Sequence, residues 1–169
     1  MIAVAELGRQ NACALKYRWF VVAIAVAAAS AFALSVQAGR WWVIGEVEIG
    51  PFGTRSPFGG PGELNWAGGS ARWERFGIAT WAAGLIAMFV LLVLAGAIAA
   101  KRVPRLAART ALVAIGTAML VGFAFLMSRP DNGLPFELAR GTYLFAGAVI
   151  AGLLVAVRVL RAAPLARVG

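Results

Sequence analysis

Residues 76–100, FGIATWAAGLIAMFVLLVLAGAIAA, form the longest uncharged stretch of this chain. Three more uncharged stretches lie at residues 19–39, 110–128 and 141–157. Each is close to the roughly 20 apolar residues that an α-helix needs to cross a lipid bilayer. The sequence therefore predicts an all-α membrane fold, in which four transmembrane helices form a bundle.

The composition excludes an ordinary soluble fold. Hydrophobic residues make up 62% of the chain and charged residues 14%, whereas a soluble domain carries roughly 25% charged residues. The chain has 169 residues, which leaves little for a separate aqueous domain, so we predict a single transmembrane domain over residues 1–169. The predicted helices cover about residues 19–39, 73–100, 107–128 and 141–160, and a long first loop covers residues 40–72.

The charged residues are divided unequally between the two sides that four spans create. One side holds the termini and the turn at residues 101–109, with ten Lys and Arg and one acidic residue. The other holds residues 40–75 and 129–140, with six basic and six acidic residues. Because Lys and Arg collect in cytoplasmic segments, we predict cytoplasmic termini and an extracytoplasmic first loop. The net charge of +9 then indicates contact with anionic membrane lipids, and we expect no nucleic-acid partner.

The first apolar stretch is interpreted as an uncleaved helix rather than a secretory signal. Trp19–Val36 holds 18 residues interrupted by two serines, whereas the apolar part of a signal peptide holds about 7–15 residues. Arginine outnumbers lysine 14 to 2, and Ala, Gly and Val are abundant, as is typical of proteins from GC-rich bacterial genomes. We therefore predict a protein of a bacterial plasma (inner) membrane.

Small residues recur on single faces of the predicted helices. Ala114, Ala118 and Gly122 follow one another every four positions in the third helix, and Gly77 and Gly84 share a face of the second. Small side chains let helix backbones approach closely in lipid, where little hydrophobic force acts between helices. We predict that these five positions pack against neighbouring helices. A homo-oligomer formed through one such face is the alternative.

The first loop carries the strand and turn signals of the chain. Polar and apolar residues alternate over Trp42–Ile49, the pattern of a half-exposed strand. A second extended piece at residues 63–67 follows two segments rich in Gly and Pro, which favour turns. We predict a small β-hairpin or sheet, braced by another element or a partner because an isolated hairpin is marginally stable in water.

Aromatic residues stand out among the turn formers of this loop. We predict that they contact a partner protein, since aromatic side chains dominate the energy of protein interfaces. For Trp41 and Trp42, the alternative is an aromatic belt at the membrane interface or a ligand-stacking role. For Phe52 and Phe58, the alternative is that they fold back onto the loop or dip into lipid headgroups. The predicted contact residues are Trp41, Trp42, Phe52, Phe58 and Trp66.

The chain lacks the residues of most catalytic and metal sites. It has no histidine and one cysteine, Cys13, so it cannot assemble a His/Cys metal or haem site or a Ser/His/Asp or Cys/His catalytic set. No charged residue interrupts the apolar stretches, unlike the membrane segments of proton relays. We expect no enzyme activity and no cofactor or metal. The alternative is catalysis or calcium binding by the loop carboxylates Glu46, Glu48, Glu63 and Glu74.

The predicted arrangement resembles the claudin-type tetraspan family. The resemblance covers four helices, cytoplasmic termini, a long first outer loop and a short second one. Trp42 and Leu64-Asn65-Trp66 are similar to the Trp and Gly-Leu-Trp elements of that family's first loop, but the two loop cysteines that the family joins are missing here. The resemblance implies a loop sheet that contacts other proteins.

These observations rank three classes of function. We predict a non-catalytic scaffold or accessory subunit, which binds other membrane or extracytoplasmic proteins through its first loop and its small-residue helix faces. A passive pore or lipid-handling module is the alternative, and it would need a polar path through the bundle. A membrane enzyme that uses the loop carboxylates is the third. The polar residues available for a path are Ser30, Ser35, Thr80, Thr117 and Thr142.

Overall fold

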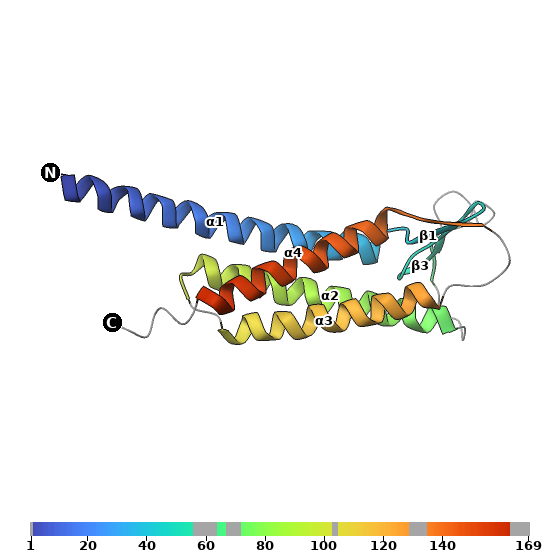
Figure 1. The fold of residues 1–169 in the computed structure, drawn as a ribbon. Helices are drawn as coiled ribbons and strands as arrows, with labels where there is room; N and C mark the ends of the chain where they lie inside the picture. Colours follow the sequence, from blue (N-terminus) through green and yellow to red (C-terminus); the bar gives the residue numbers. More distant parts are fainter. Residues whose placement is uncertain (1, 56–63, 67–71, 103–104, 129–134, 163–169) are drawn as a thin grey trace.

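Four α-helices make up most of the molecule and confirm the predicted helical bundle (Figure 1). They are α1 (Ile2–Gln37), α2 (Arg72–Ala99), α3 (Arg105–Met127) and α4 (Arg140–Ala162). The structure is a computed structural model. It describes residues 2–55, 64–66, 72–102, 105–128 and 135–162, with side chains for residues 17–54, 72–102, 105–128 and 135–162.

The helices form a ring in which each packs against its neighbours in sequence and α4 closes against α1. Each is long and apolar enough to cross a membrane, and together they make the chain an integral, tetraspan membrane protein. The start of α1 and the end of α4 lie at one end of the bundle and the strands at the other (Figure 1). We call these the termini end and the sheet end.

Helix α1 differs most from its predicted length. It begins at Ile2, although its membrane-spanning part covers only Tyr17–Gln37. The preceding residues include Ala, Leu, Glu, Gln and Lys, which favour helix whether or not they are apolar. The helix therefore continues beyond the bundle at the termini end (Figure 1), where hydropathy alone predicted no helix.

The single strand predicted over Trp42–Ile49 is wrong, because this segment folds as a hairpin. Strand β1 (Trp42–Ile44) pairs antiparallel with β2 (Val47–Ile49), and Ile44 lies opposite Val47. Gly45 has a φ of 60°, as the first turn position of a type II′ hairpin requires. A two-residue turn keeps Ile44 and Val47 on one face, so the alternation that the sequence suggested changes phase there.

The hairpin belongs to a five-stranded sheet with strand order β4-β3-β2-β1-β5. Strands β3 (Gly53–Arg55) and β4 (Leu64–Trp66) complete the part contributed by the first loop. Strand β5 (Phe136–Leu138) comes from the connection between α3 and α4 and pairs with β1. The second loop thus supplies the brace that a small hairpin needs, and we call the five strands together the loop sheet.

Candidate functional site

Trp41 joins the loop sheet to the bundle at the point where α1 gives way to β1. Its side chain is 0% exposed, and its indole Nε1 donates a hydrogen bond to the Ser35 carbonyl at 3.1 Å. Ser35 lies in the last turn of α1, where carbonyls have no partner within the helix. Trp41 therefore caps the helix that precedes it.

The backbone of Trp41 ties three further elements together. Its amide donates to the Ile49 carbonyl of β2 at 2.8 Å, and its carbonyl accepts from the Ala139 amide at 3.0 Å. The same carbonyl accepts the Thr142 hydroxyl of α4 at 3.1 Å. One residue thus connects α1, the hairpin, the end of β5 and the start of α4.

A buried serine completes this junction between α1 and α4. The Ser35 hydroxyl, which is fully buried, donates to the Gly141 carbonyl at 2.8 Å. The Gly141 amide donates in turn to the Arg40 carbonyl at 2.7 Å. Because buried polar groups are costly unless they are hydrogen-bonded, this network favours one relative position of α1, β1 and α4. We call the contacts of Ser35, Arg40, Trp41, Gly141 and Thr142 the Trp41 junction.

An aromatic cluster packs around the junction. Its ring centroids lie 4.8 Å apart for Trp41 and Phe145, 5.3 Å for Trp41 and Phe125, and 4.4 Å for Trp42 and Phe125. Phe32 meets Phe145 edge to face at 5.3 Å, a favourable arrangement of two rings. The cluster brings together α1, β1, α3 and α4, so the sheet and the helices share one core.

Burial of Trp41 and Trp42 removes them from the predicted contact surface and from an aromatic belt. Both are almost fully buried, because the sheet folds down onto the helix ends. Phe52 is half-buried, with its ring centroid 5.8 Å from that of Trp81 on α2, as the fold-back alternative describes. Trp66 lies in β4 opposite Gly53, and Phe58 lies outside the described residues.

The predicted small-residue positions are all buried in the bundle. They include Ala114 and Ala118 of α3. A Cβ added at Gly84 would lie 2.6 Å from Val36 of α1, and one added at Gly122 would lie 2.7 Å from the Phe145 ring. One added at Gly77 would lie 3.1 Å from the Pro51 carbonyl oxygen. At Gly84 and Gly77, where glycine has no side chain, helix α2 therefore lies close to α1 and to the turn between β2 and β3.

The loop carboxylates are spread over the sheet end. Glu48 forms an ion pair with Arg40, and Glu46 is exposed in the β1–β2 turn. Glu74 lies in the first turn of α2, and Glu63 lies outside the described residues. Within the described part of the chain, no three His, Cys, Asp or Glu residues lie close enough to hold a metal ion.

The polar residues proposed for a membrane path are also scattered. Ser35 belongs to the Trp41 junction, and the buried Thr80 hydroxyl bonds the Phe76 carbonyl of its own helix at 2.7 Å. Ser30 and Thr117 are exposed on the outside of the bundle. These groups do not line one passage, so the pore alternative gains no support from their positions.

Among the described strands, β5 forms one edge of the loop sheet, and all three of its residues are exposed. Phe136 lies opposite Ile44 and Leu138 opposite Trp42, so both side chains lie on the sheet face that carries these buried residues. Leu138 nevertheless remains 46% exposed. The apolar face of the sheet therefore continues past the part that the bundle covers.

An apolar groove begins next to this strand. It has a volume of 240 Å³ and lies between α3 and α4. Trp41 and Thr142 form its end nearest the loop sheet, and Thr142 follows Leu138 by four residues. Phe123 and Ile150 line it and are each 61% exposed. We call it the α3–α4 groove. Its described lining contains no charged residue and is completed by Met119, Gly122, Leu126, Phe145, Ala146 and Val149.

Strand β5 and the role of Ser35 are not predicted by the sequence. The only local signal for β5 is the apolar-polar-apolar order Phe136-Glu137-Leu138 after Pro135, which is too short to predict a strand by itself. Ser35 gives no signal, because its partner Gly141 is 106 residues away in the chain.

Comparison of the chain with protein-family models, with curated proteins and with solved structures gave no significant match. The chain therefore shares a tetraspan architecture with a small sheet with claudin-type proteins. No match shows that it belongs to that family.

Proposed function

We propose that this protein is a non-catalytic scaffold or accessory subunit of a membrane complex, and that it binds its partner through β5 and the adjacent α3–α4 groove. The observation that carries the proposal is the exposed apolar edge of a sheet whose position is fixed by the Trp41 junction. An edge strand can accept a strand from another chain. A transmembrane helix of the same partner fits the groove beside it.

The groove suits a protein helix because of its shape and composition. Gly122 and Ala146 provide small positions between larger side chains, and small residues favour close approach of helices in lipid. The rigid attachment of the loop sheet to the bundle also supports the proposal, because a surface that is already ordered loses little conformational entropy when it binds a partner. In this proposal the loop sheet has the contact role that it has in claudin-type proteins.

The proposal places the sheet end outside the cytoplasm of a bacterial cell and the termini inside. It is supported by the exposed cations Lys101, Arg102 and Arg109 at the termini end and by the equal numbers of acids and bases in the two loops at the sheet end. Positive residues near membrane spans favour the cytoplasmic side.

Cysteine labelling tests this orientation. In a Cys13→Ser background, Glu46→Cys and Arg102→Cys each place one thiol at an exposed position at opposite ends of the bundle. A membrane-impermeant maleimide added to intact cells or spheroplasts is expected to label the first variant and not the second, and lysed membranes should label both. Labelling of Arg102→Cys alone in intact cells would reverse the orientation.

Affinity purification tests the proposed contact. Leu138→Lys puts a charge on the edge strand, a change that natural proteins use to block edge pairing. Leu106→Lys is a matched control, because Leu106 is 79% exposed at the start of α3, at the termini end. A partner that co-purifies in mild detergent is expected to be lost from Leu138→Lys and retained by Leu106→Lys. Loss from both variants, or from neither, would contradict a contact at β5.

A further inference from the structure

A second groove lies between α1 and α4 at the termini end. It encloses 400 Å³, within the range of about 300–1,000 Å³ that is usual for ligand pockets. The two helices line it with matching stripes at the spacing of one helix face. The stripe of α1 is Tyr17, Phe20, Val21 and Ile24, and that of α4 is Ala151, Leu154, Val155 and Arg158. We call it the α1–α4 groove.

The groove exists because α1 and α4 diverge along their length. Near the sheet end they are held together by the Ser35–Gly141 hydrogen bond and the contact of Phe32 with Phe145. Toward the termini end the two helices separate (Figure 1). Phe20 and Leu154, on the two walls of the groove, are each more than 60% exposed. The space between them is therefore open to lipid.

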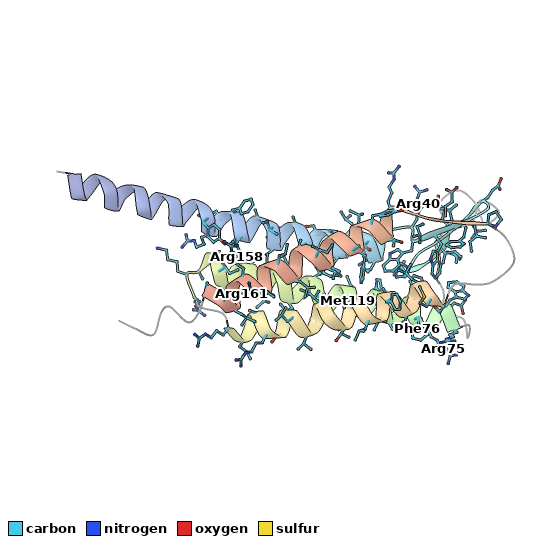
Figure 2. The ribbon with its side chains drawn as sticks, in the orientation of Figure 1. Arg40, Arg75, Phe76, Met119, Arg158 and Arg161 are labelled. Atoms are coloured by element: carbon cyan, nitrogen blue, oxygen red, sulfur yellow. The ribbon has the colours of Figure 1, made fainter. Side chains whose placement is uncertain are left out.

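Arg158 gives the groove a charged end. Its guanidinium carbon lies 5.2 Å from the centroid of the Tyr17 ring, and Figure 2 shows Arg158 and Arg161 near the termini end of α4. Within the described part of the chain, Arg158 forms no ion pair with a carboxylate. The only acidic residue that the sequence places on this side of the membrane is Glu6. A positive charge beside an apolar groove favours an anionic amphiphile.

The position of Arg158 along α4 matches the level of a lipid headgroup. It follows Arg140 by 18 residues, or about 27 Å of helix at 1.5 Å per residue, close to the hydrocarbon thickness of about 30 Å. Ala151 and Ile24, at the other end of the groove, lie about two turns deeper. The groove thus runs from the headgroup level into the hydrocarbon, as a phospholipid does.

We propose that the α1–α4 groove binds an anionic phospholipid, with the phosphate on Arg158 and an acyl chain along Phe20, Ile24 and Leu154. Tyr17 adds a hydroxyl at the headgroup level and holds the guanidinium over its ring. The described lining of the α3–α4 groove has no charged group, so the two grooves select different occupants. This proposal is independent of the partner contact at β5.

Native mass spectrometry of the detergent-purified protein tests the lipid site. Phosphatidylglycerol and phosphatidylcholine with the same acyl chains are added separately, and the bound lipid is counted. We expect about fivefold tighter binding of phosphatidylglycerol, the effect of about 1 kcal/mol per basic residue near anionic lipid. Arg158→Gln should remove this preference and Arg158→Lys should keep it. Arg161→Gln is the matched control, because Arg161 is exposed on the same helix and does not line the groove, and it should leave the preference unchanged.

A photoactivatable acyl chain on phosphatidylglycerol locates the site. Cross-links are expected on Phe20, Ile24 or Leu154 and should compete with unlabelled phosphatidylglycerol. Equal binding of the two lipids, an equal effect of Arg158→Gln and Arg161→Gln, or cross-links spread evenly around the bundle would overturn the proposal, because each indicates general attraction to the membrane surface. Specific cross-linking of a Leu154→Cys variant to another polypeptide would also overturn it, since a protein would then occupy the groove.

Discussion

Trp41→Ala is expected to lower the free energy of unfolding by about 3–5 kcal/mol, the usual cost of truncating a buried aromatic residue to alanine. The change removes a ring that contacts Phe125 and Phe145 and leaves the Ser35 carbonyl without its indole donor. Trp41→Phe keeps a ring in the cluster but lacks the N–H, so we expect it to lose about 1 kcal/mol from the hydrogen bond. Unfolding in mixed detergent–SDS micelles, followed by circular dichroism, measures both.

Trp19→Ala is the matched control for this loss. Trp19 is 52% exposed on α1 at the termini end and lies outside the aromatic cluster, so its removal leaves the junction intact. If Trp41→Ala and Trp19→Ala were equally stable, Trp41 would not join the sheet to the bundle, and the account of the junction would be wrong.

Gly141→Ala is expected to destabilise the protein by about 3 kcal/mol, at the upper end of the usual cost of overpacking. The added Cβ would lie 2.6 Å from Trp41 Cδ1, 2.7 Å from the Arg40 carbonyl oxygen and 2.8 Å from the Gly39 carbonyl carbon. Two of these three neighbours are backbone atoms, which cannot rotate away. The start of α4 must therefore move away from the Gly39–Trp41 segment that precedes β1, and the 2.7 Å hydrogen bond from the Gly141 amide to the Arg40 carbonyl is lost with it.

Gly147→Ala makes the same chemical change in the same helix and serves as the control. No atom lies within 4 Å of a Cβ added at Gly147, and alanine in a helix interior is favoured over glycine by roughly 0.5–1 kcal/mol. We expect Gly147→Ala to be neutral or stabilising. Thermal denaturation of the two variants in the same detergent should differ clearly, and similar melting temperatures would contradict a tight contact at Gly141.

The helices were predictable because the membrane imposes one strong requirement on them. A long run of apolar residues without charge identifies a spanning helix from composition alone, and residues 76–100 needed no other information. The small residues Ala118 and Gly122 were predictable for a similar reason, since close helix packing in lipid depends on small side chains. The extension of α1 to Ile2 was not predictable in this way, because hydropathy does not detect a helix outside the bilayer.

The sheet end was predictable only in outline. Alternation over Trp42–Ile49 indicated extended structure, but the turn at Gly45 changed which side chains share a face. The burial of Trp41 and Trp42 depends on Phe125 and Phe145, which are more than 80 residues away in the chain. A tryptophan beside a predicted span fits a membrane belt equally well, so local sequence cannot distinguish the two positions. β5 likewise depends on its partner strand β1.

In-cell photo-cross-linking from β5 tests the central claim most directly, that the exposed edge of an anchored sheet binds another protein. A photoreactive phenylalanine analogue replaces Leu138 in one variant and Leu106 in another, and the irradiated products are separated by mass. We predict a discrete adduct with one polypeptide from position 138 and none of that mass from position 106. An equal pattern from the two positions, or adducts with lipid alone from position 138, would contradict the claim.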